Sequence, residues 1–526
     1  MDNNKILEGI VWITGPAGAV FTERYDDEVI IEIEPKDYAQ VCKHLHKALR
    51  SPVMSMFASD ERVSRKEFVL YCVFADYDTG KWYVVITAAG GTAATPSFAS
   101  ISKDIYSALL FERELKEQFG IIPEGCPDTR RLNLHDEVWP EGFYPLRKDF
   151  KKPDAGTVKD YVFDKIEGEG LFEVPVGPVH AGVIGPGHFR FSVAGEPIIN
   201  LEIRLGFTHR GVEKLFEGKD IRQALPLSEC VCGDSAFAHS LAFCLAAEKI
   251  AGVKIPPRAE YLRAVFLELE RMYNHVSDVG GIAVDVGFSF PNALASMIKE
   301  RLLRLNERIS GSRYLKGLNI PGGVAKDMDK FVLAFVKDEL AAVGRDFGDL
   351  KKMLFANGTF MDRIEGTGIL KKRVAEDLGV TGLAARASGI VNDLRKIRPI
   401  YQKACFQAVK EDSGDVCARL NVRIREFEES RRLIEKFVSD IPAGPVRAEF
   451  DINGIEGSAL GCVEAWRGPV LYWVSLDKNG IITRCKVTDP SVKNWQGLAF
   501  AAPGNIVPDF PLCNKSFDLS YSGNDL

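Results

Sequence analysis

The sequence lacks several features that mark common protein classes. It contains no C-x-x-C pair, and its 11 cysteines are scattered, the nearest two being Cys230 and Cys232. Neither a disulfide framework nor a zinc or iron–sulfur site of closely spaced thiolates is therefore expected. No apolar run approaches the roughly 20 residues that a membrane helix needs. The first residues, MDNNKILEGI, do not form a signal peptide. We expect a soluble chain in a reducing cytoplasm that can dock onto a membrane partner.

An excess of positive charge is also missing. Lys and Arg number 67 against 73 Asp and Glu, which gives a formal net charge of −6. This balance argues against a nucleic-acid binder of the broadly basic kind. The chain is instead rich in apolar residues, with 46% hydrophobic and 27% charged residues in a length of 526. That composition supports large cores, and the length predicts roughly two to four domains.

The pattern of the chain changes near residue 150. Residues 1–150 combine strand-like runs (EVIIEIEP, FVLYCVFADY and KWYVVITA) with helical patterns at Asp37–Leu49 and Ser100–Phe119. They predict a small α+β domain. Residues 151–168 are largely polar, with one Pro and two Gly, and are expected to form a linker.

Residues 169–526 are expected to form a second, larger domain. A strand-like stretch punctuated by Gly and Pro runs to about Gly206, and the tail 446–489 returns to strand-like alternation. Between them, apolar stripes at helical spacing predict helices at Arg258–Val279, Ala293–Ile309, Asp329–Phe347, Leu383–Arg395 and Val416–Val438. The predicted fold class is α+β: a small N-terminal α+β domain followed by a large, mainly α-helical domain with β-elements at its ends.

Several strings in the first domain are specific enough to indicate a family. They are FERELKEQFGI (111–121), CPDTRRL (126–132) and YPLRKDF (144–150). Together they resemble the signature of the small peripheral-arm subunit of respiratory complex I. The same small domain is fused to the front of the hydrogenase large subunits of the formate-hydrogenlyase type.

The second domain resembles the hydrogenase-like subunit of complex I and the large subunit of membrane-bound, energy-converting nickel–iron hydrogenases. The matching strings are VGPVHAGVIGPGHFRF (176–191), FTHRGVEKLFEGKD (207–220), RAEYLRAVFLELERMYNHVSDVGG (258–281), ARASGIVNDLRK (385–396) and EAWRGP (464–469). The resemblance covers nearly the whole chain in order. It implies that residues 169–526 adopt the nickel–iron hydrogenase large-subunit fold.

The resemblance also shows which metal ligands are missing. These hydrogenases hold nickel and iron with four thiolates, from a C-G-x-C and a D-P-C-x-x-C motif, because soft sulfur donors suit that centre. Here the first motif reads CGDS (232–235) and the second reads DLSYSG (518–523), so one thiolate of four remains. The chain ends at Leu526, where such hydrogenases carry a removable extension. We predict that this chain has no nickel–iron centre and that it belongs to a branch of the family without the nickel ligands.

The quinone contacts that complex I implies are incomplete too. That subunit offers a His from an early hairpin and a Tyr from a later loop, and two such groups can hydrogen-bond to and protonate a quinone carbonyl. His180 and His188 lie in the hairpin stretch and are candidate cofactor-binding residues; His188 is the closer match and a candidate catalytic residue. Gly233 stands where the Tyr is expected, and Gly185 where hydrogenases often have an acidic residue.

The resemblance assigns candidate roles to further residues. Glu213 and Cys232 are the candidate metal ligands, with a buried ion pair and an inert buried thiol as the alternatives. Asp234 and Asp518 border the emptied pocket and are candidate catalytic proton carriers, provided that burial raises their pKa; solvated surface carboxylates are the alternative.

Two arginines and a charged helix complete the candidates. Arg386 and Arg467 match family arginines near the metal pocket and are candidate cofactor-binding residues, or else structural anchors. The charged residues of 258–275 follow helical spacing, which orders helices; in a family helix that faces the membrane subunits, a proton relay is the alternative.

The implied function is that of a subunit in a membrane-associated, complex I-like oxidoreductase that couples electron transfer to ion translocation. Its implied partners are an iron–sulfur electron-transfer subunit and membrane subunits of antiporter and anchor type, which would hold it on the cytoplasmic face of the cell membrane. The acceptor would be a quinone or another small redox compound. Two alternatives stay open: an NADH:quinone oxidoreductase-type subunit in contact with quinone, and a non-catalytic scaffold between the electron-transfer and membrane arms.

Overall fold

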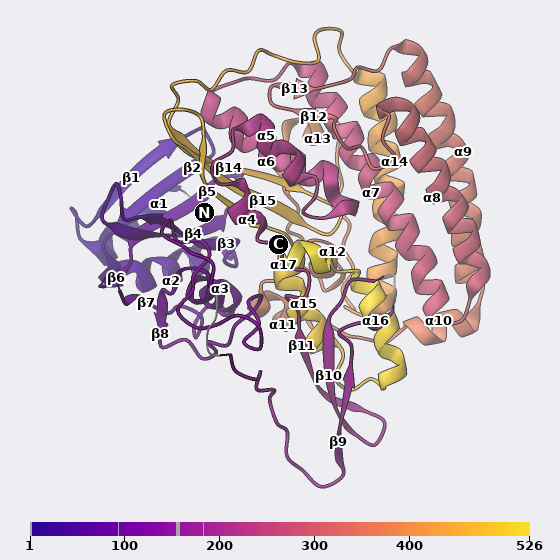
Figure 1. Ribbon diagram of the computed structural model, residues 1–526. Coiled ribbons are helices and arrows are strands. Elements are labelled where there is room, and N and C mark those ends of the chain that lie inside the picture. The colour runs from indigo at the N-terminus through magenta and orange to yellow at the C-terminus, as the bar shows by residue number, and fades with distance from the viewer. Residues whose placement is uncertain (1–2, 93, 154–157, 182–183) are drawn as a thin grey trace.

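The computed structural model describes residues 3–92, 94–153, 158–181 and 184–526. Figure 1 shows a sheet formed by the N-terminal part on one side and a group of long helices on the other, with the C-terminus near the middle of the protein. The elements of the N-terminal part are α1 (Asn3–Thr14), β1 (Ala19–Arg24), β2 (Glu28–Ile33), η1 (Pro35–Asp37), α2 (Tyr38–Leu49), β3 (Ser55–Glu61), β4 (Glu67–Ala75), β5 (Trp82–Ala88), β6 (Gly90–Gly91), β7 (Pro96–Ala99), η2 (Tyr106–Ala108), α3 (Leu109–Phe119) and β8 (Ile122–Glu124), where η marks a 3₁₀ helix.

The N-terminal sheet has both faces covered. Its strand order is β1-β2-β5-β4-β3, in which β2 and β5 pair in parallel and the other neighbours are antiparallel. One face packs on α1, α2 and α3 through residues such as Val41 and Phe111. The other face packs on the C-terminal part through Leu460 and Trp473. Burial on both faces explains why FVLYCVFA is almost continuously apolar.

The larger part begins with a three-stranded sheet and continues mainly as helices. Its first elements are β9 (Leu171–Val176), β10 (His188–Ala194), β11 (Ile198–Arg204), α4 (Val212–Phe216), α5 (Ile221–Ser228), η3 (Gly233–Ser235), α6 (Ala236–Ala251), α7 (Pro257–Asp285), α8 (Ser289–Ser310), β12 (Asn319–Ile320), β13 (Gly323–Val324), α9 (Lys330–Phe355) and α10 (Gly358–Ile364). It continues with α11 (Lys372–Leu378), α12 (Gly382–Ala387), η4 (Leu394–Ile397), α13 (Pro399–Lys403), α14 (Val416–Asp440), β14 (Gly457–Glu464), β15 (Pro469–Leu476), β16 (Ile482–Thr488), α15 (Ser491–Ala501), η5 (Val507–Asp509), α16 (Phe510–Phe517) and α17 (Tyr521–Asp525).

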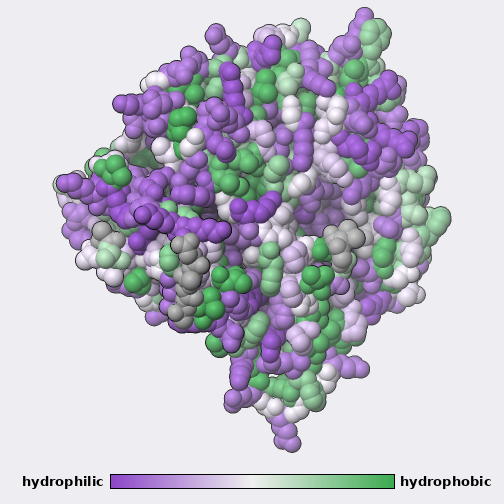
Figure 2. All heavy atoms as spheres, in the orientation of Figure 1, coloured by the Kyte–Doolittle hydropathy of each residue, from purple (hydrophilic) through white to green (hydrophobic). Residues whose placement is uncertain are grey.

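The long helices α7, α8, α9 and α14 lie side by side and share one hydrophobic core with α6 and the β14-β15-β16 sheet (Figure 1). The β11-β10-β9 sheet projects from the protein (Figure 1). In Figure 2 the displayed face is mainly hydrophilic, and hydrophobic residues are more frequent over this projecting sheet. The α+β class, with a large helical part flanked by strands, is confirmed.

Most predicted elements are present, and two predicted helices are too long. The helix expected over Ser100–Phe119 is limited to α3, because the buried Glu112 carboxylate accepts hydrogen bonds from the Ile101 and Ser102 amides and holds that segment as a loop. The helix expected over Leu383–Arg395 ends at Ala387. Of the predicted linker 151–168, residues 154–157 lie outside the described part, and the others contain neither helix nor strand.

No single helix among the described residues is both long and apolar enough to cross a membrane. The strongly bent pair Ile221–Ser228 and Gly233–Ala251 passes the length and composition test only when its two helices are taken together.

A buried lysine lies where the two parts of the protein meet. Lys493, in the first turn of α15, is 3% exposed, and its ammonium donates to the Val53 carbonyl at 3.2 Å. Its other neighbour is the Met54 thioether sulfur, at 3.9 Å. Within the described residues no carboxylate pairs with it. Burial therefore lowers the pKa of Lys493 to about 7.

Replacing this lysine by an apolar residue should stabilise the protein near neutral pH. In the unfolded chain the lysine titrates near 10.4. Its burial therefore lowers the free energy of unfolding most at pH 7 and below, and this penalty falls as the pH rises toward 10. Lys493→Met should raise the free energy of unfolding at pH 7 by roughly 2–4 kcal/mol. Denaturant unfolding at pH 7 and pH 9.5 measures the change, with the exposed Lys478→Met as the control. An equal gain at both pH values would contradict a neutralised lysine.

Candidate functional site

The two motif segments of the predicted metal site meet in one set of contacting side chains, which we call the pocket because it lies where the metal motifs come together. Cys232 precedes η3 and α6, while Ser520 is the N-cap of α17. The Cys232 Sγ lies 3.0 Å from the Ser520 Oγ, although 288 residues separate the two. The Ser520 Oγ also accepts a hydrogen bond from the Gly523 amide at 2.8 Å. Its hydroxyl therefore caps a helix, which is a common role for serine.

The residues of this pocket do not fit a nickel–iron centre. Ser235 and Ser520 offer hydroxyls, Gly523 offers no side chain, and Cys232 is left as the one sulfur donor of the four positions. A Cβ added at Gly523 would lie 2.6 Å from the Asp489 Oδ2, so a cysteine there requires Asp489 to move. Both the thiolate donors and the space that they need are missing.

The guanidinium of Arg467 lies at the centre of the pocket. It donates to the two oxygens of the Asp234 carboxylate at 2.7 and 2.8 Å. The same group lies 3.4 Å from the Ser235 Oγ, 3.5 Å from the Cys232 Sγ and 3.3 Å from the Asp518 Oδ2. One cation thus contacts the remaining thiol, one replaced ligand position and both candidate aspartates. Bidentate pairing of this kind is strong and directional.

The turn between β14 and β15 that carries Arg467 is held from two sides. A Cβ at Gly382 would lie 2.0 Å from the Arg467 carbonyl oxygen, so α12 can approach this turn only with glycine there. The Trp466 indole donates to the Ser235 Oγ at 3.0 Å, and the guanidinium stacks on the Trp466 ring at 3.9 Å. These contacts fix the guanidinium in the pocket.

Charge pairing keeps both pocket aspartates ionised. Burial alone would raise the pKa of Asp234, but the adjacent Arg467 outweighs burial and lowers it. Burial would also raise the pKa of Asp518, but Lys515 and Arg467 outweigh burial and hold that pKa well below its usual range. The raised pKa that a proton-carrier role for Asp234 and Asp518 requires is therefore not found. Burial does raise the pKa of the Cys232 thiol, which therefore stays protonated at neutral pH.

Lys515 extends the charge pairing from the pocket to the long helices. Its ammonium lies 2.7 Å from the Asp518 Oδ1 and 3.3 Å from the Asp278 Oδ1 on α7. The Asp278 Oδ2 accepts from Arg423 of α14 at 2.9 Å. The lysine stem runs past Gly281, where a Cβ would lie 2.3 Å from its Cε. Side chains of alternating charge thus connect the pocket to α7 and α14.

Of the two candidate histidines, His180 contacts the C-terminal motif. Its Nε2 lies 3.2 Å from the Tyr521 hydroxyl. His188, at the start of β10, has its Nδ1 3.3 Å from the Gly177 carbonyl, and its ring packs on Phe163 with centroids 5.1 Å apart. Burial lowers the pKa of both histidines, so both are neutral at pH 7. His180 thus has a tyrosine partner, which comes from the segment that follows Ser520.

The carboxylate of Glu213 is paired with cations. It lies 2.8 Å from Arg484 and 3.0 Å from Lys486, both on β16, and accepts from the Val487 amide at 3.1 Å. Although burial raises the pKa of Glu213, the two cations outweigh burial and lower it. These contacts favour the ion-pair alternative over a metal ligand. Among the described residues, no group of three or more His, Cys, Asp or Glu is placed to hold a metal ion.

Arg386 belongs to a different cluster from Arg467. Its guanidinium lies 2.6 Å from Glu426 and 2.8 Å from Glu464, and it is fully buried. These contacts support its alternative role as a structural anchor.

Sequence reasoning missed three residues that shape the pocket. Asp489, which packs against Gly523, also bonds the buried His239 at 3.1 Å. Tyr521 and Lys515 were not singled out either. A signal existed for the last two, because Tyr521 lies inside the DLSYSG string and Lys515 precedes Asp518 by one helical turn. No local signal pointed to Asp489.

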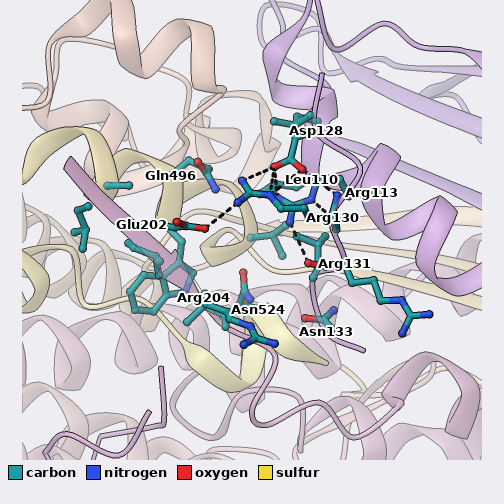
Figure 3. Close-up of a pocket in the computed structure, with 18 of the residues that line it drawn as sticks. Leu110, Arg113, Asp128, Arg130, Arg131, Asn133, Glu202, Arg204, Gln496 and Asn524 are labelled. Carbon is teal, nitrogen blue, oxygen red and sulfur yellow. Dashed lines mark hydrogen bonds and ion pairs between the residues drawn. The ribbon is translucent and has the colours of Figure 1, made fainter. Parts of the chain in front are cut away.

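A separate cavity of about 420 Å³ lies between the CPDTRRL loop, β11 and α15 (Figure 3). Figure 3 shows Arg130 at its centre, directed toward Asp128 and Glu202. Arg130 pairs with both carboxylates, at 2.9 and 3.0 Å, and Arg113 pairs with Asp128 at 3.3 Å. These arginines already have carboxylate partners, so the cavity is a polar joint between the two parts of the protein.

Three family models match successive parts of the chain. The Respiratory-chain NADH dehydrogenase, 30 Kd subunit, matches residues 31–155, and the 49 Kd subunit of the same enzyme matches residues 285–454. The Nickel-dependent hydrogenase model matches residues 210–278.

Curated relatives match either nearly the whole chain or about two thirds of it. Formate hydrogenlyase subunit 5 of Escherichia coli is 31% identical over 508 residues, covering 95% of this chain and 89% of that protein. NADH-quinone oxidoreductase subunit 4 of Thermus thermophilus is 30% identical over 372 residues, covering 65% of this chain and 91% of that protein. The carbon monoxide-induced hydrogenase of Rhodospirillum rubrum is 32% identical, covering 67% of this chain and 98% of that protein. The chain therefore belongs to the family of complex I-like oxidoreductase subunits that fuse a 30-kDa-type and a hydrogenase-like 49-kDa-type domain.

Proposed function

We propose that this chain forms the electron-acceptor site of a membrane-associated, complex I-like oxidoreductase that couples electron transfer to ion translocation without a nickel–iron centre. The observation that carries the proposal is the position of Arg467. Its guanidinium contacts Cys232, Ser235, Asp234 and Asp518, in the pocket where the thiolate motifs of the hydrogenases meet. The groups that meet there are polar and charged, which suits polar chemistry on a small acceptor.

The acceptor is a small compound that gains negative charge on an oxygen when it is reduced, as a quinone does. Arg467 is placed to stabilise that charge, since a fixed cation in a buried site stabilises developing negative charge strongly. The neutral His180 and the hydroxyl of Tyr521, 3.2 Å apart, supply two hydrogen-bonding groups beside the pocket. A quinone takes up two electrons and two protons; the Tyr521 hydroxyl is suited to donate one proton, and the neutral His180 can take up a proton and pass it to Tyr521.

The partners follow from the same proposal. Electrons come from a cluster in an iron–sulfur subunit, and membrane subunits of antiporter and anchor type move the ion. The chain then sits on the cytoplasmic face of the membrane and is held there by those partners. The formate hydrogenlyase and NADH-quinone oxidoreductase names of its relatives support membership of a multi-subunit assembly.

One observation favours a second candidate, a scaffold without chemistry of its own. The Arg467 guanidinium is already paired with Asp234 and Asp518, and Lys515 joins Asp518 to Asp278 on α7. Such internal pairing transmits position between segments without needing a ligand. In this case the chain links the electron-transfer arm to the membrane arm.

The purified complex should contain iron but no stoichiometric nickel. A single thiol that burial keeps protonated cannot hold a bimetallic centre whose other thiolates are missing. Metal analysis by inductively coupled plasma mass spectrometry checks this outcome, with a nickel-containing relative purified in the same buffers as the control. One nickel ion per chain would refute the absence of the centre.

Removal of the Tyr521 hydroxyl should slow quinone reduction. Loss of a positioned proton donor costs roughly 10²-fold or more in rate, so Tyr521→Phe should lower kcat to about that extent. The matched control is Tyr83→Phe, which removes a hydroxyl that bonds Asn3 in the N-terminal part. Ferricyanide, which takes electrons without protons, should be reduced at an unchanged rate. Unchanged quinone turnover in both Tyr521→Phe and His180→Asn would favour the scaffold.

A further inference from the structure

Eight buried ionisable groups form one cluster beside the pocket. The cluster consists of Glu268, Arg271 and His275 of α7, Arg386 of α12, Asp393 and Arg395 of the following segment, Glu426 of α14 and Glu464 of β14. None of them is more than 2% exposed. We call this set the buried cluster. The proposed function assigns no role to it.

Ion pairs join all of its acids to its arginines. Glu426 lies 2.6 Å from Arg386, 3.7 Å from Arg271 and 3.7 Å from Arg395, and 3.0 Å from the His275 Nε2. Glu426 is therefore the most fully compensated acid of the cluster.

Two other acids are also well compensated. Glu268 contacts Arg271 at 3.0 Å and Arg395 at 3.4 Å, and it accepts hydrogen bonds from the hydroxyls of Ser430 and Tyr401. Asp393 lies 2.8 Å from Arg395 and 3.4 Å from Arg386.

Glu464 has the fewest partners. Its carboxylate pairs with Arg386 at 2.8 Å and accepts from the Leu394 amide at 3.3 Å. Its other titratable neighbours are Asp393, the phenol of Tyr77 and, without an ion pair to Glu464, Arg395, which opposes the effect of burial on the pKa of Glu464 more weakly than Arg386 does. Arg271 bonds the carbonyl of Glu464 instead of its carboxylate.

The charges of the buried cluster do not balance when every acid is ionised. It holds four carboxyl groups against three guanidinium groups, and within the described residues no further cation pairs with them. Burial, together with Arg423 and Arg271, outweighs Glu426 and lowers the pKa of His275 to about 4, so the imidazole is neutral. An uncompensated charge in a dry interior is costly enough that the group takes up a proton instead. At neutral pH one carboxyl group should therefore be protonated.

The effect of burial on the carboxyl pKa is least opposed at Glu464. There burial raises the pKa to about 7, with the ionised Asp393 adding to the shift and Arg386 opposing it. The other three acids have lowered pKa values, because their guanidinium partners outweigh burial. The proton count and the contact geometry thus select the same residue.

The buried cluster adjoins the pocket through Trp466. The ring of His275 meets that of Trp466 edge to face, with centroids 6.1 Å apart, and the indole of Trp466 bonds Ser235 of the pocket. The Nδ1 of His275 is buried and has no hydrogen-bond partner among the described residues. With Nε2 donating to Glu426, this Nδ1 is a free proton acceptor within the cluster. Glu464 itself precedes Arg467 by three residues.

We propose that the buried cluster is a proton-binding site that holds one exchangeable proton on Glu464 and supplies it to the Arg467 pocket when an acceptor is reduced there. The supply step rests on the proposed function; the proton site does not. In that step the Glu464 O–H bond breaks, the proton passes to the acceptor and Glu464 is left ionised. The electrons come from the iron–sulfur partner, and solvent returns the proton.

Infrared difference spectroscopy of the intact complex tests the site directly. Between pH 6 and pH 8 the wild-type protein should lose a protonated-carboxyl band, and Glu464→Gln should lack that band. The matched control is Glu270→Gln, since Glu270 is a buried carboxyl of α7 outside the cluster that caps α6, with a pKa that burial raises to about 8. Glu270→Gln should remove a second band, which disappears near pH 8, and should leave the Glu464 band in place. If Glu464→Gln keeps every pH-dependent carboxyl band of the wild type, including the one that remains in Glu270→Gln, the proposal is overturned.

Stability gives a second readout for the same residue. A carboxyl group whose pKa is raised on folding destabilises the folded state above that pKa, and the penalty vanishes at low pH. Glu464→Gln carries no charge to bury, so its unfolding temperature should exceed that of wild type at pH 8 and match it near pH 4. Failure of this variant to fold at pH 8 would show that ionised Glu464 is required and would refute the proton site.

Turnover measurements distinguish the proton site on Glu464 from the supply of its proton to the acceptor. In the assembled complex, quinone reduction by Glu464→Gln should lose the inflection near pH 7 that the wild type shows. An unchanged pH profile together with a missing infrared band would overturn the supply step and leave the proton site standing. If wild type reduces no small acceptor at any pH, the proposed function fails, and the infrared result still decides the site.

Discussion

A buried guanidinium must be compensated, and in this protein that requirement organises the whole pocket. Arg467 needs both Asp234 and Asp518 because it lies among neutral groups, a protonated thiol and two hydroxyls. Asp518 in turn pairs with Lys515, and Lys515 pairs with Asp278 on α7. The ion pairs that begin at Arg467 therefore extend to the long helix α7. Once thiolates were replaced by serine and glycine, salt bridges became the interactions that hold these segments together.

The sequence predicted the kinds of elements well and their ends less well. The strands β4, β5, β15 and β16 and the long helices were recognisable because their apolar periodicity is strong. The predicted helices over 100–119 and 383–395 were too long, and the structure gives the reason for the first of them. Glu112 satisfies the amides of a loop from a distance of about ten residues in the chain, and apolar spacing carries no trace of such a contact. The burial of the second face of the N-terminal sheet could not be predicted either, because that face is covered by strands far along the chain.

For the site, motifs located the pocket and three-dimensional pairing decided its chemistry. The strings CGDS and DLSYSG predicted that Cys232 and Ser520 would meet, and they do. The sign of the pKa shifts at Asp234 and Asp518 could not be predicted because it depends on Arg467, which is distant in sequence from Asp234, and on Lys515, which was not singled out. The choice between His180 and His188 depended on which one reaches Tyr521. Contacts across several hundred residues cannot be read from local spacing.

The close approach of Gly523 to Asp489 makes the loss of the metal ligands difficult to reverse. A mutation that restores sulfur at position 523 alone would push away the carboxylate that holds His239 in place. Sulfur at position 523 therefore requires a second change that moves the Asp489 carboxylate, and the serines at positions 235 and 520 would still have to be replaced before four thiolates could face one metal centre. Single substitutions in the present arrangement do not create such a centre.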